Sequence, residues 1–375
     1  MHLTSFGWNS FFSEQFQPFQ AEGLIPGRVA MVQKQSYVVF HEQGESPARL
    51  SGRFRYQSQT PGELPTVGDW VAIQLADSML IQAVLPRKNC LTRTPPISGG
   101  RKLRAIHGES MIIGGTTEEQ LIAANIDTGF IVTSLDDDFS LGRLERYLTL
   151  LRANRIAPVI VLNKADLQDD LARYREQVQA IAAETPVFCV SARQQRGLEA
   201  LTPYLTPGCT ACFLGSSGVG KSTMINAFLG ADRQKTGQIS EVTGKGRHVT
   251  TYRELIPLPA GGVLIDNPGI REVKIWGEQE DINRSFADID MLFDSCRFRN
   301  CTHTSEPGCA VLAAIQHGEL DERRYRNYLR QLREVDALAM RKHDRSRLDV
   351  RNKKRKLHAK DEYRLTRRNR ERREH

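Results

Sequence analysis

The sequence predicts an α/β fold, preceded by a small all-β barrel and followed by a small metal-binding helical module. Strand-like apolar runs alternate with helical segments from about residue 127, which is typical of a layered domain with a mostly parallel sheet. Five short β-rich runs fill residues 27–86, and three cysteines and one histidine cluster within residues 296–309. With 375 residues, 40% of them hydrophobic, the chain can build two or three cores.

Changes in composition along the chain set the expected domain boundaries. Residues 87–120, which contain "RTPPISGGRK" and "GGTT", are expected to be irregular and to carry a flexible loop. The expected units are an N-terminal extension at 1–26, an OB-fold-like barrel at 27–90, a linker at 91–109, the α/β domain at 110–275, the metal-binding domain at 276–340 and a basic tail at 341–375.

The barrel is predicted from the runs "GRVAMVQ", "SYVVFHE", "ARLSGRFRY", "DWVAIQLA" and "MLIQAVLP", which Gly, Pro and polar turns separate. An OB-fold fits, although spacing alone does not distinguish it from an SH3-like barrel. Arg53, Arg55 and Tyr56 lie on these runs and are suited to neutralise RNA and stack on its bases. Trp70 follows a Gly-Asp turn and is expected in the barrel core rather than on a base-binding surface.

The α/β domain is predicted from apolar runs that alternate with segments of helical periodicity. Strands are expected at 127–135, 157–166, 186–192 and 209–215, with further candidates in "TYRELIPL" and "GGVLIDNPG". Helices are expected at 141–154, 171–184, 197–205 and 221–230.

The string "GSSGVGKS" matches the phosphate-binding pattern G-x-x-x-x-G-K-[ST] in full, between an apolar strand and a helix. Its glycines let backbone N–H groups turn toward phosphate oxygens, and the helix adds its positive N-terminus. Lys221 is expected to reach the β- and γ-phosphates, and Ser222 to ligate Mg²⁺. The expected binding residues are Gly215, Ser216, Ser217, Gly218, Val219, Gly220, Lys221, Ser222 and Thr223.

The string "NKAD" ends a buried strand, where α/β domains place ligand loops. The Asp166 carboxylate can accept hydrogen bonds from N1–H and the 2-amino group of guanine, which adenine lacks, so ATP is disfavoured. Asn163 is expected to touch the base or to tie loops together. The other residues expected in the guanine-binding site are Lys164 and Ala165 of this string and Ser191 and Ala192 of "VSA". The Ala192 N–H would bind guanine O6.

Two further segments predict magnesium-binding and switch elements. "LIDNPG" is an apolar strand ending in D-x-x-G, so Asp266 would hold Mg²⁺ through water and the Gly269 N–H would sense the γ-phosphate. "TGKGRHVTTYRE" is polar and contains glycine, and Thr250 within it is favoured over Thr251 to close on Mg²⁺ when GTP is bound.

These elements occur in an unusual order, because the base-reading loops precede the phosphate loop and both switches follow it. Neither motif is therefore taken as a chance match. We interpret the domain as circularly permuted, which a fold tolerates where its original termini lie close together on the surface.

The cluster "CRFRNCTHTSEPGC" has the spacing C-x4-C-x-H-x5-C, formed by Cys296, Cys301, His303 and Cys309. Three thiolates and one imidazole complete a tetrahedral zinc site with no open position, so one structural Zn²⁺ is expected. Buried free cysteines are the alternative. Arg297 and Arg299, with the more distant Lys274, would suit contact with RNA.

The basic charge is concentrated near the C-terminus. Residues 323–375 contain 21 Lys and Arg against 8 Asp and Glu, although the whole chain carries only +8. Such a tail favours a polyanionic partner, with a solvated helix as the alternative. Residues 321–339 have helical apolar spacing and are expected to pack on the metal module. Seven cysteines, the absence of an apolar run long enough to span a bilayer and an N-terminus unlike a signal peptide together predict a cytoplasmic protein.

This combination resembles the RsgA family, the circularly permuted GTPases of small ribosomal subunit biogenesis. The resemblance covers roughly residues 27–340 and rests on the order of "NKAD", "VSA", "GSSGVGKS" and "DNPG", on "GRHVTT", and on the cysteine–histidine spacing. It implies an OB-fold, a permuted GTPase domain and a zinc domain. It also implies GTP hydrolysis that the small ribosomal subunit stimulates, and a role late in the maturation of that subunit.

Catalysis is expected to depart from the common GTPase pattern. Ile270 follows Gly269, where many GTPases use a glutamine to orient the attacking water. His248 is therefore the candidate to position the water, with an RNA contact or a loop hydrogen bond as the alternative. We expect slow intrinsic hydrolysis that rises when RNA orders the switch.

The expected partners are the small ribosomal subunit and its rRNA, with no membrane or DNA, and the expected state is a monomer. One alternative is a GTP-dependent translation or stress regulator without an assembly role. Another is an RNA-binding protein that uses GTP only as a structural ligand. The intact Lys221, Ser222 and Asp266 disfavour the second alternative.

Overall fold

The computed structural model describes residues 2–33, 36–58, 60–75, 78–93, 120–230, 253–266 and 279–340, with the strands at 101–104 and 110–113. Several predicted features fall outside these residues, among them His248, Thr250, Gly269, Ile270, Lys274, most of the switch segment 243–254 and the basic tail at 341–375.

The N-terminal barrel is closed by five strands, as predicted. β1 (Ile25–Val32), β2 (Tyr37–His41) and β3 (Gly44–Leu50) run in order, β5 (Met79–Val84) pairs with β3, and β4 (Trp70–Gln74) pairs with both β5 and β1. The barrel interior holds Val29, Val39, Val71, Ile73 and Ile81, which are fully buried. This order, with a short helix between the third and fourth strands, matches the predicted OB-like barrel.

The run "ARLSGRFRY" was predicted as one strand, and its second half is a helix instead. β3 ends at Leu50, and α2 (Gly52–Gln57) begins after Ser51, whose Oγ accepts a hydrogen bond from the backbone N–H of Phe54 at 3.1 Å. This cap satisfies a free N–H of the first turn and so favours helix over strand. The exposed Arg53, Arg55 and Tyr56 therefore project from a helix at the barrel surface. A 3₁₀ turn, η2 (Pro61–Glu63), follows.

The first residues pack on the barrel rather than extending from it. A 3₁₀ turn, η1 (Leu3–Phe6), and helix α1 (Ser10–Ala21) cover one side of it. Trp8 and Phe12 stack with each other, and both contact Trp70, at ring-centroid distances of 4.7 and 5.7 Å. Trp70 is fully buried, as predicted, but it lies between the N-terminal residues and the barrel rather than among the side chains of the barrel interior.

The segment 87–120 was expected to be irregular, but it contains three short strands, and a fourth begins at its last residue. β6 (Cys90–Arg93) pairs with β9 (Gln120–Ala124), and β7 (Arg101–Arg104) pairs with β8 (Ser110–Ile113), both antiparallel. The strands have four or five residues each, too short for an alternating pattern to stand out beside the Gly and Pro residues.

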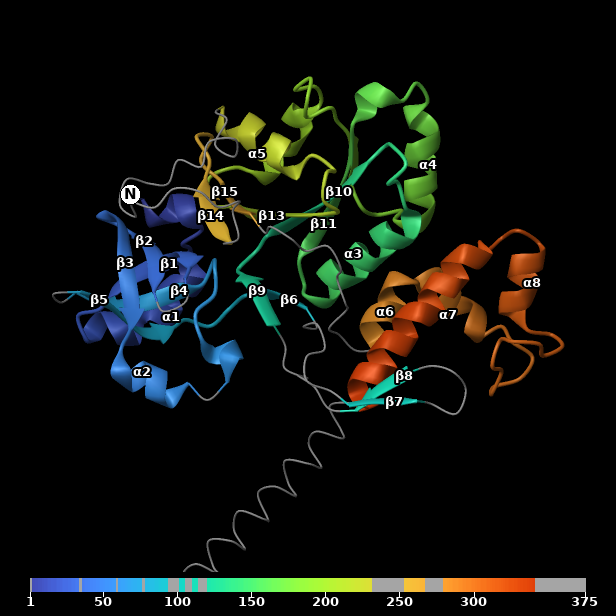
Figure 1. Ribbon diagram of the computed structural model, residues 1–375, viewed down its shortest axis with the longest axis horizontal. Helices are drawn as coiled ribbons and strands as arrows, with labels where there is room; N and C mark the ends of the chain where they lie inside the picture. The colour runs from blue at the N-terminus through green and yellow to red at the C-terminus, as the bar shows by residue number, and fades with distance from the viewer. Residues whose placement is uncertain are drawn as a thin grey trace, which may run out of the picture.

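The α/β domain follows the predicted alternation of strands and helices (Figure 1). Its sheet has the order β12-β11-β10-β13-β15-β14, and β14 continues through one pair, Met31 with Glu254, into β1 of the barrel. The strands are β10 (Thr128–Ser134), β11 (Ala157–Asn163), β12 (Val187–Cys189), β13 (Thr210–Leu214), β14 (Glu254–Pro257) and β15 (Val263–Asp266). The helical elements are α3 (Leu141–Ala153), η3 (Ala165–Leu167), α4 (Leu171–Ile181), η4 (Leu198–Tyr204) and α5 (Lys221–Leu229).

The C-terminal module is helical. It contains α6 (Gln279–Ser285), α7 (Ala287–Phe293), α8 (Ala310–Gln316) and a final helix over residues 322–340. Phe286 and Tyr328, with rings 5.5 Å apart, lie at the centre of its core. The predicted packing of residues 321–339 on this module is confirmed. Among the described helices, none has the length and apolar character needed to cross a bilayer.

Candidate nucleotide site and metal centre

Parallel strands bring the sequence motifs to one edge of the sheet. β12, β11, β10, β13 and β15 are mutually parallel, so their carboxyl ends lie together, and only β14 runs opposite. The loops after Asn163, Cys189 and Leu214, and the end of β15 at Asp266, therefore meet at the same place. Ligands bind at this edge in open α/β sheets.

The phosphate loop has the backbone that its glycines predict. Gly215, Gly218 and Gly220 have φ of 147, 83 and 101°, and a Cβ on Gly215 would lie 2.2 Å from the carbonyl oxygen of Val132. Lys221 Nζ donates to the carbonyl oxygens of Gly215 at 2.7 Å and Ser216 at 2.5 Å. Burial lowers the pKa of Lys221, while the charge of Asp266 opposes that shift. A lysine held in this way lies across the loop that would receive the phosphates.

Asn163 joins the base-reading loop to the phosphate loop. Its Nδ2 donates to the carbonyl oxygen of Val219 at 2.7 Å, and its Oδ1 accepts from the N–H of Ala192 at 3.0 Å. The side chain is 3% exposed, and a Cβ on Gly220 would lie 2.1 Å from its Nδ2. Asn163 therefore takes the second of its two expected roles, tying loops together.

Asp166 and Ser191 lie at an exposed cleft of about 520 Å³, which Ala165, Arg196 and Glu199 also line. A hydrogen bond with the Ser191 side chain holds the pKa of Asp166 below its ordinary value. The carboxylate therefore stays ionised and can accept hydrogen bonds from a base.

Sequence reasoning missed the loop after β10, which supports both nucleotide motifs. Lys164, at φ 62°, donates from Nζ to Asp136 Oδ2 at 2.7 Å. Burial alone would raise the pKa of Asp136, but hydrogen bonds from Lys164, Ser134 and the Asp138 N–H lower it to about 2. The missed signal was "DDD" (Asp136–Asp138) directly after a buried strand at the carboxyl edge.

Three further residues predicted to bind nucleotide or Mg²⁺ lie at the same edge of the sheet. Ser222 and Thr223 are exposed in the first turn of α5, and Asp266 ends β15. Asp266 lies close enough to Lys221 to affect its pKa, so the magnesium candidate and the phosphate lysine share one site.

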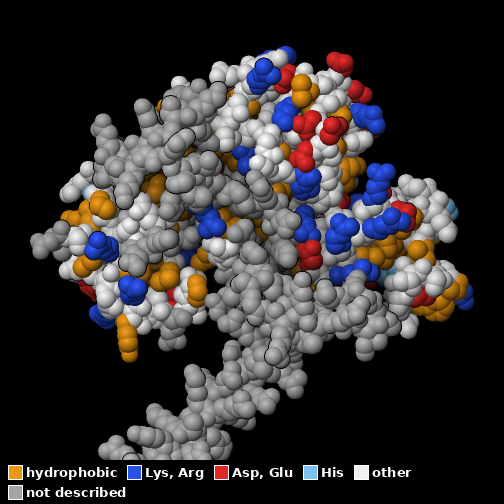
Figure 2. Space-filling model, in the orientation of Figure 1, with side chains coloured by type: hydrophobic (Ala, Val, Ile, Leu, Met, Phe, Trp, Pro, Cys, Tyr) orange, Lys and Arg blue, Asp and Glu red, His pale blue; other side chains and the backbone are white. Residues whose placement is uncertain are grey.

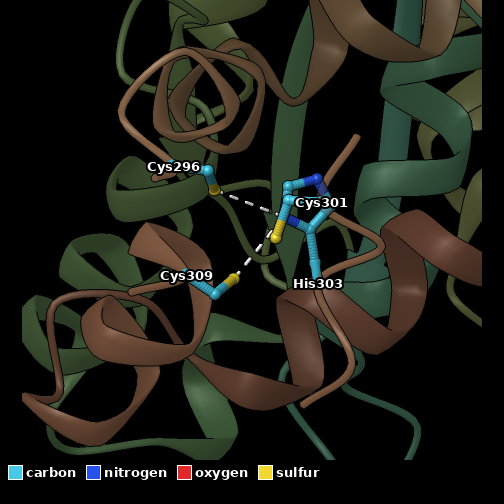
Figure 3. Close-up of side chains that lie close together, drawn as sticks. All are labelled: Cys296, Cys301, His303 and Cys309. Atoms are coloured by element: carbon cyan, nitrogen blue, oxygen red, sulfur yellow. Dashed lines mark hydrogen bonds between the residues drawn. The ribbon is translucent and has the colours of Figure 1, made fainter. Parts of the chain in front are cut away.

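The four predicted metal ligands converge in the C-terminal module (Figure 3). The donor atoms of Cys296, Cys301, His303 and Cys309 all lie within 4.8 Å of one another. His303 Nδ1 is 3.5 Å from the Sγ atoms of Cys296 and Cys309, and Phe293 stacks on the imidazole at 4.3 Å. Three thiols and one imidazole directed at one point fit a closed, four-coordinate metal site.

Comparisons with known proteins agree with this arrangement. The family model described as RsgA GTPase matches residues 84–276. A protein of Opitutus terrae named small ribosomal subunit biogenesis GTPase RsgA is 44% identical over 346 residues, which cover 89% of this chain and 90% of that protein. A protein of the same name from Methanosarcina acetivorans is 42% identical over 328 residues, 86% and 83% of the two chains.

Two solved structures also resemble the chain. YjeQ from Thermotoga maritima has a TM-score of 0.58 and 28% sequence identity, covering 83% of this chain and 98% of that one. YloQ, described as a circularly permuted GTPase, has a TM-score of 0.55 and 27% identity, covering 84% and 95%. The permuted domain order predicted from the motifs is thus found in a structural relative.

Proposed function

Because this chain belongs to the RsgA GTPase family, we propose that it hydrolyses GTP to GDP and phosphate in late maturation of the small ribosomal subunit. One observation supports this most directly. Asn163 connects the base-reading loop and the phosphate loop by hydrogen bonds to Val219 and Ala192, although the two motifs occur in reverse order along the chain. One nucleotide can therefore contact both.

Guanine recognition would depend on Asp166, which accepts from N1–H and the 2-amino group. The exposed carboxylate is held by Ser191 and kept ionised, as this role requires. The Ala192 N–H already donates to Asn163, so an O6 acceptor would share it in a three-centre bond. Lys164, fixed by Asp136, would place its stem beside the base.

Phosphate binding would use the backbone N–H groups of residues 215–223, with Lys221 at the β- and γ-phosphates. Ser222 and Asp266 would hold Mg²⁺, with Thr250 completing the site. When bound, Mg²⁺ neutralises charge that develops on the phosphate oxygens. His248 would orient the attacking water, because Ile270 cannot, and RNA would stimulate hydrolysis by ordering this segment.

The metal-binding module would hold one structural Zn²⁺, since thiolate and imidazole are the ligands that zinc prefers in closed sites. With the metal bound, Cys296, Cys301, His303 and Cys309 would fix the loop that carries Arg297 and Arg299.

The proposed partner is the rRNA of the small subunit, bound by a cytoplasmic monomer. Basic side chains gather on the module and the adjoining face of the α/β domain in Figure 2. The exposed residues Arg323, Arg326, Arg330 and Arg333 recur at helical spacing on the outer side of helix 322–340. Such a row can neutralise successive phosphates of an RNA backbone. The exposed Arg53, Arg55 and Tyr56 on α2 offer a second contact.

The test is single-turnover GTP hydrolysis, measured alone and with isolated small or large ribosomal subunits. We expect a slow intrinsic rate that only small subunits raise, and loss of hydrolysis in Lys221→Ala. Equal rates with and without small subunits would contradict the proposed RNA stimulation. Absence of phosphate release under every condition would contradict GTP hydrolysis.

A further inference from the structure

The first turn of α3 contacts the phosphate loop through Arg143. Its guanidinium pairs with Asp138 Oδ2 at 2.6 Å, and the same NH1 donates to Ser216 Oγ. Ser216 is the second residue of the phosphate loop, and its carbonyl oxygen accepts from Lys221. Arg143 thus contacts the phosphate loop through the Ser216 side chain.

The same turn of α3 holds the metal-binding module on its other side. The carbonyl oxygen of Gly142 accepts from Asn327 Nδ2 at 3.2 Å. Glu145, only 4% exposed, accepts from Asn327 at 2.5 Å and also pairs with Arg324. A second ion pair joins Arg146 to Glu334, about two turns beyond Asn327 on helix 322–340.

We propose that Arg143 is a positioning residue that couples the phosphate loop to the metal-binding module through this turn. The inference rests on the proposed function, because it requires a guanine nucleotide in the loop. A nucleotide that orders Ser216 restricts Arg143 and hence Gly142 and Glu145, which hold helix 322–340.

The buried contact at Glu145 makes the connection stiff. A carboxylate that is 4% exposed needs both of its partners, since an unpaired buried charge is costly. The module therefore moves with α3 or loses these bonds. Coupling of this kind is reciprocal, so a change at the module must alter nucleotide affinity by the same factor.

A double-mutant cycle on GDP affinity tests the proposal, using fluorescent GDP and the full chain. Arg143→Met removes the contacts with Asp138 and Ser216, and Asn327→Ala removes two bonds from the module to α3. We expect Asn327→Ala to weaken GDP binding about fivefold in the wild-type background and to have no further effect beside Arg143→Met. If the two substitutions weaken GDP binding independently, so that their factors multiply in the double variant, the coupling is overturned.

Matched variants separate coupling from damage to the fold. Asp336→Asn removes a charge from the exposed side of the same helix, away from Asn327 and its contacts with α3, so GDP affinity should not change. Ser216→Ala removes the acceptor without touching α3 and should abolish the effect of Asn327→Ala, as Arg143→Met does. An Asn327→Ala effect that persists in Ser216→Ala would overturn the role of this contact.

Amide hydrogen exchange provides a readout that a purely structural role would not change. GDP should slow exchange in residues 322–340 of the wild type by about threefold or more, and should have no such effect in Arg143→Met. Wild-type protein that binds GDP without this change would overturn the coupling alone. Failure of the wild type to bind GDP would overturn both the coupling and the proposed nucleotide site.

Discussion

Asn163 donates from Nδ2 to the carbonyl oxygen of Val219 at 2.7 Å, and this bond joins two loops that are 56 residues apart in the chain. The loops belong to adjacent parts of one sheet edge, so the contact depends on strand order in space rather than in sequence. A permuted chain can therefore build the same pocket, because β10 lies between β11 and β13.

Replacing Asn163 should weaken both nucleotide binding and the fold. Asn163→Ala leaves the Val219 carbonyl and the Ala192 N–H without their buried partner, which we expect to cost about 2–3 kcal/mol of unfolding free energy. GTP affinity should fall because the two loops lose their link. Urea unfolding and fluorescent-nucleotide binding measure the two effects.

The isosteric variant Asn163→Asp separates these contributions. It keeps an acceptor for Ala192 but places a carboxylate oxygen against the Val219 carbonyl oxygen. We expect it to bind GTP at least as poorly as Asn163→Ala. Wild-type affinity in Asn163→Asp would show that the contact with Val219 has no role in binding.

Substitution of Asp166 should remove the preference for guanine. Asp166→Asn replaces one acceptor with a donor opposite N1–H and the 2-amino group, so GTP affinity should fall by about 100-fold or more. Competition between GTP and ATP measures the remaining selectivity, which should be small. Asp169→Asn is the matched control, since Asp169 is exposed three residues further along. Full GTP selectivity in Asp166→Asn would mean that another group reads the base.

The parts of the structure that the sequence predicted are those with strong local patterns. β11 and β13 are apolar runs that end in motif loops, and the cysteine–histidine spacing identified ligands that do converge. The failures have local causes. The cap by Ser51 changed a predicted strand into α2, and β7 and β8 are too short to show a period.

The contacts of the site were harder to predict than its motifs. The role of Arg143 depends on Ser216, which lies 73 residues away, and that of Asp136 depends on how β10 sits beside β11. Each residue looks like an ordinary surface charge in sequence. Only the sheet order shows that both face nucleotide loops.

Acid should remove the stabilisation that Asp136 provides. Its pKa is about 2 in the folded protein and 3.8 ordinarily, so the ionised form stabilises the fold. For a lowered pKa, this contribution is complete above pH 3.8 and is lost as the pH falls toward 2. The stability difference between wild type and Asp136→Asn should therefore be present at pH 5–6 and should shrink between about pH 4 and pH 2.

Urea unfolding at steps of pH measures this difference, with Asp137→Asn as the control because Asp137 is exposed beside it. The stability difference between wild type and Asp137→Asn should not change with pH in this way. A difference for Asp136→Asn that stays constant from pH 6 to pH 2 would show that the carboxylate does not gain stability from Lys164.

Removal of the metal should unfold the C-terminal module first. We expect one zinc ion per chain by elemental analysis, lost in Cys301→Ser or after chelation. Because a closed metal site supplies folding free energy, residues 279–340 should then become sensitive to protease. Cys209→Ser is the control, since Cys209 lies outside the cluster, 3.4 Å from Thr206 Oγ1. A metal-free module that resists protease as well as the wild type would show that the cluster does not support the fold.

Arg28 should be the most sensitive position between the barrel and the α/β domain. It is 1% exposed and donates to the carbonyl oxygens of Phe6, Gly68 and Asn125, which belong to the N-terminal turn, the barrel and the α/β domain. Burial lowers the pKa of Arg28 to about 10, although the nearby carboxylates of Asp127 and Asp69 act to raise it. Arg28 therefore remains charged at neutral pH.

Arg28→Met keeps the length of the side chain but removes the buried cation that donates to these three carbonyl oxygens. Breaking a buried charge network in this way costs about 3–5 kcal/mol. For a domain of this size, the apparent Tm should fall by about 6–20 °C. Arg49→Met on the exposed side of the same barrel should change it little. Equal Tm values for Arg28→Met and Arg49→Met would show that the pairing of β1 with β14, and not Arg28, holds the barrel to the α/β domain.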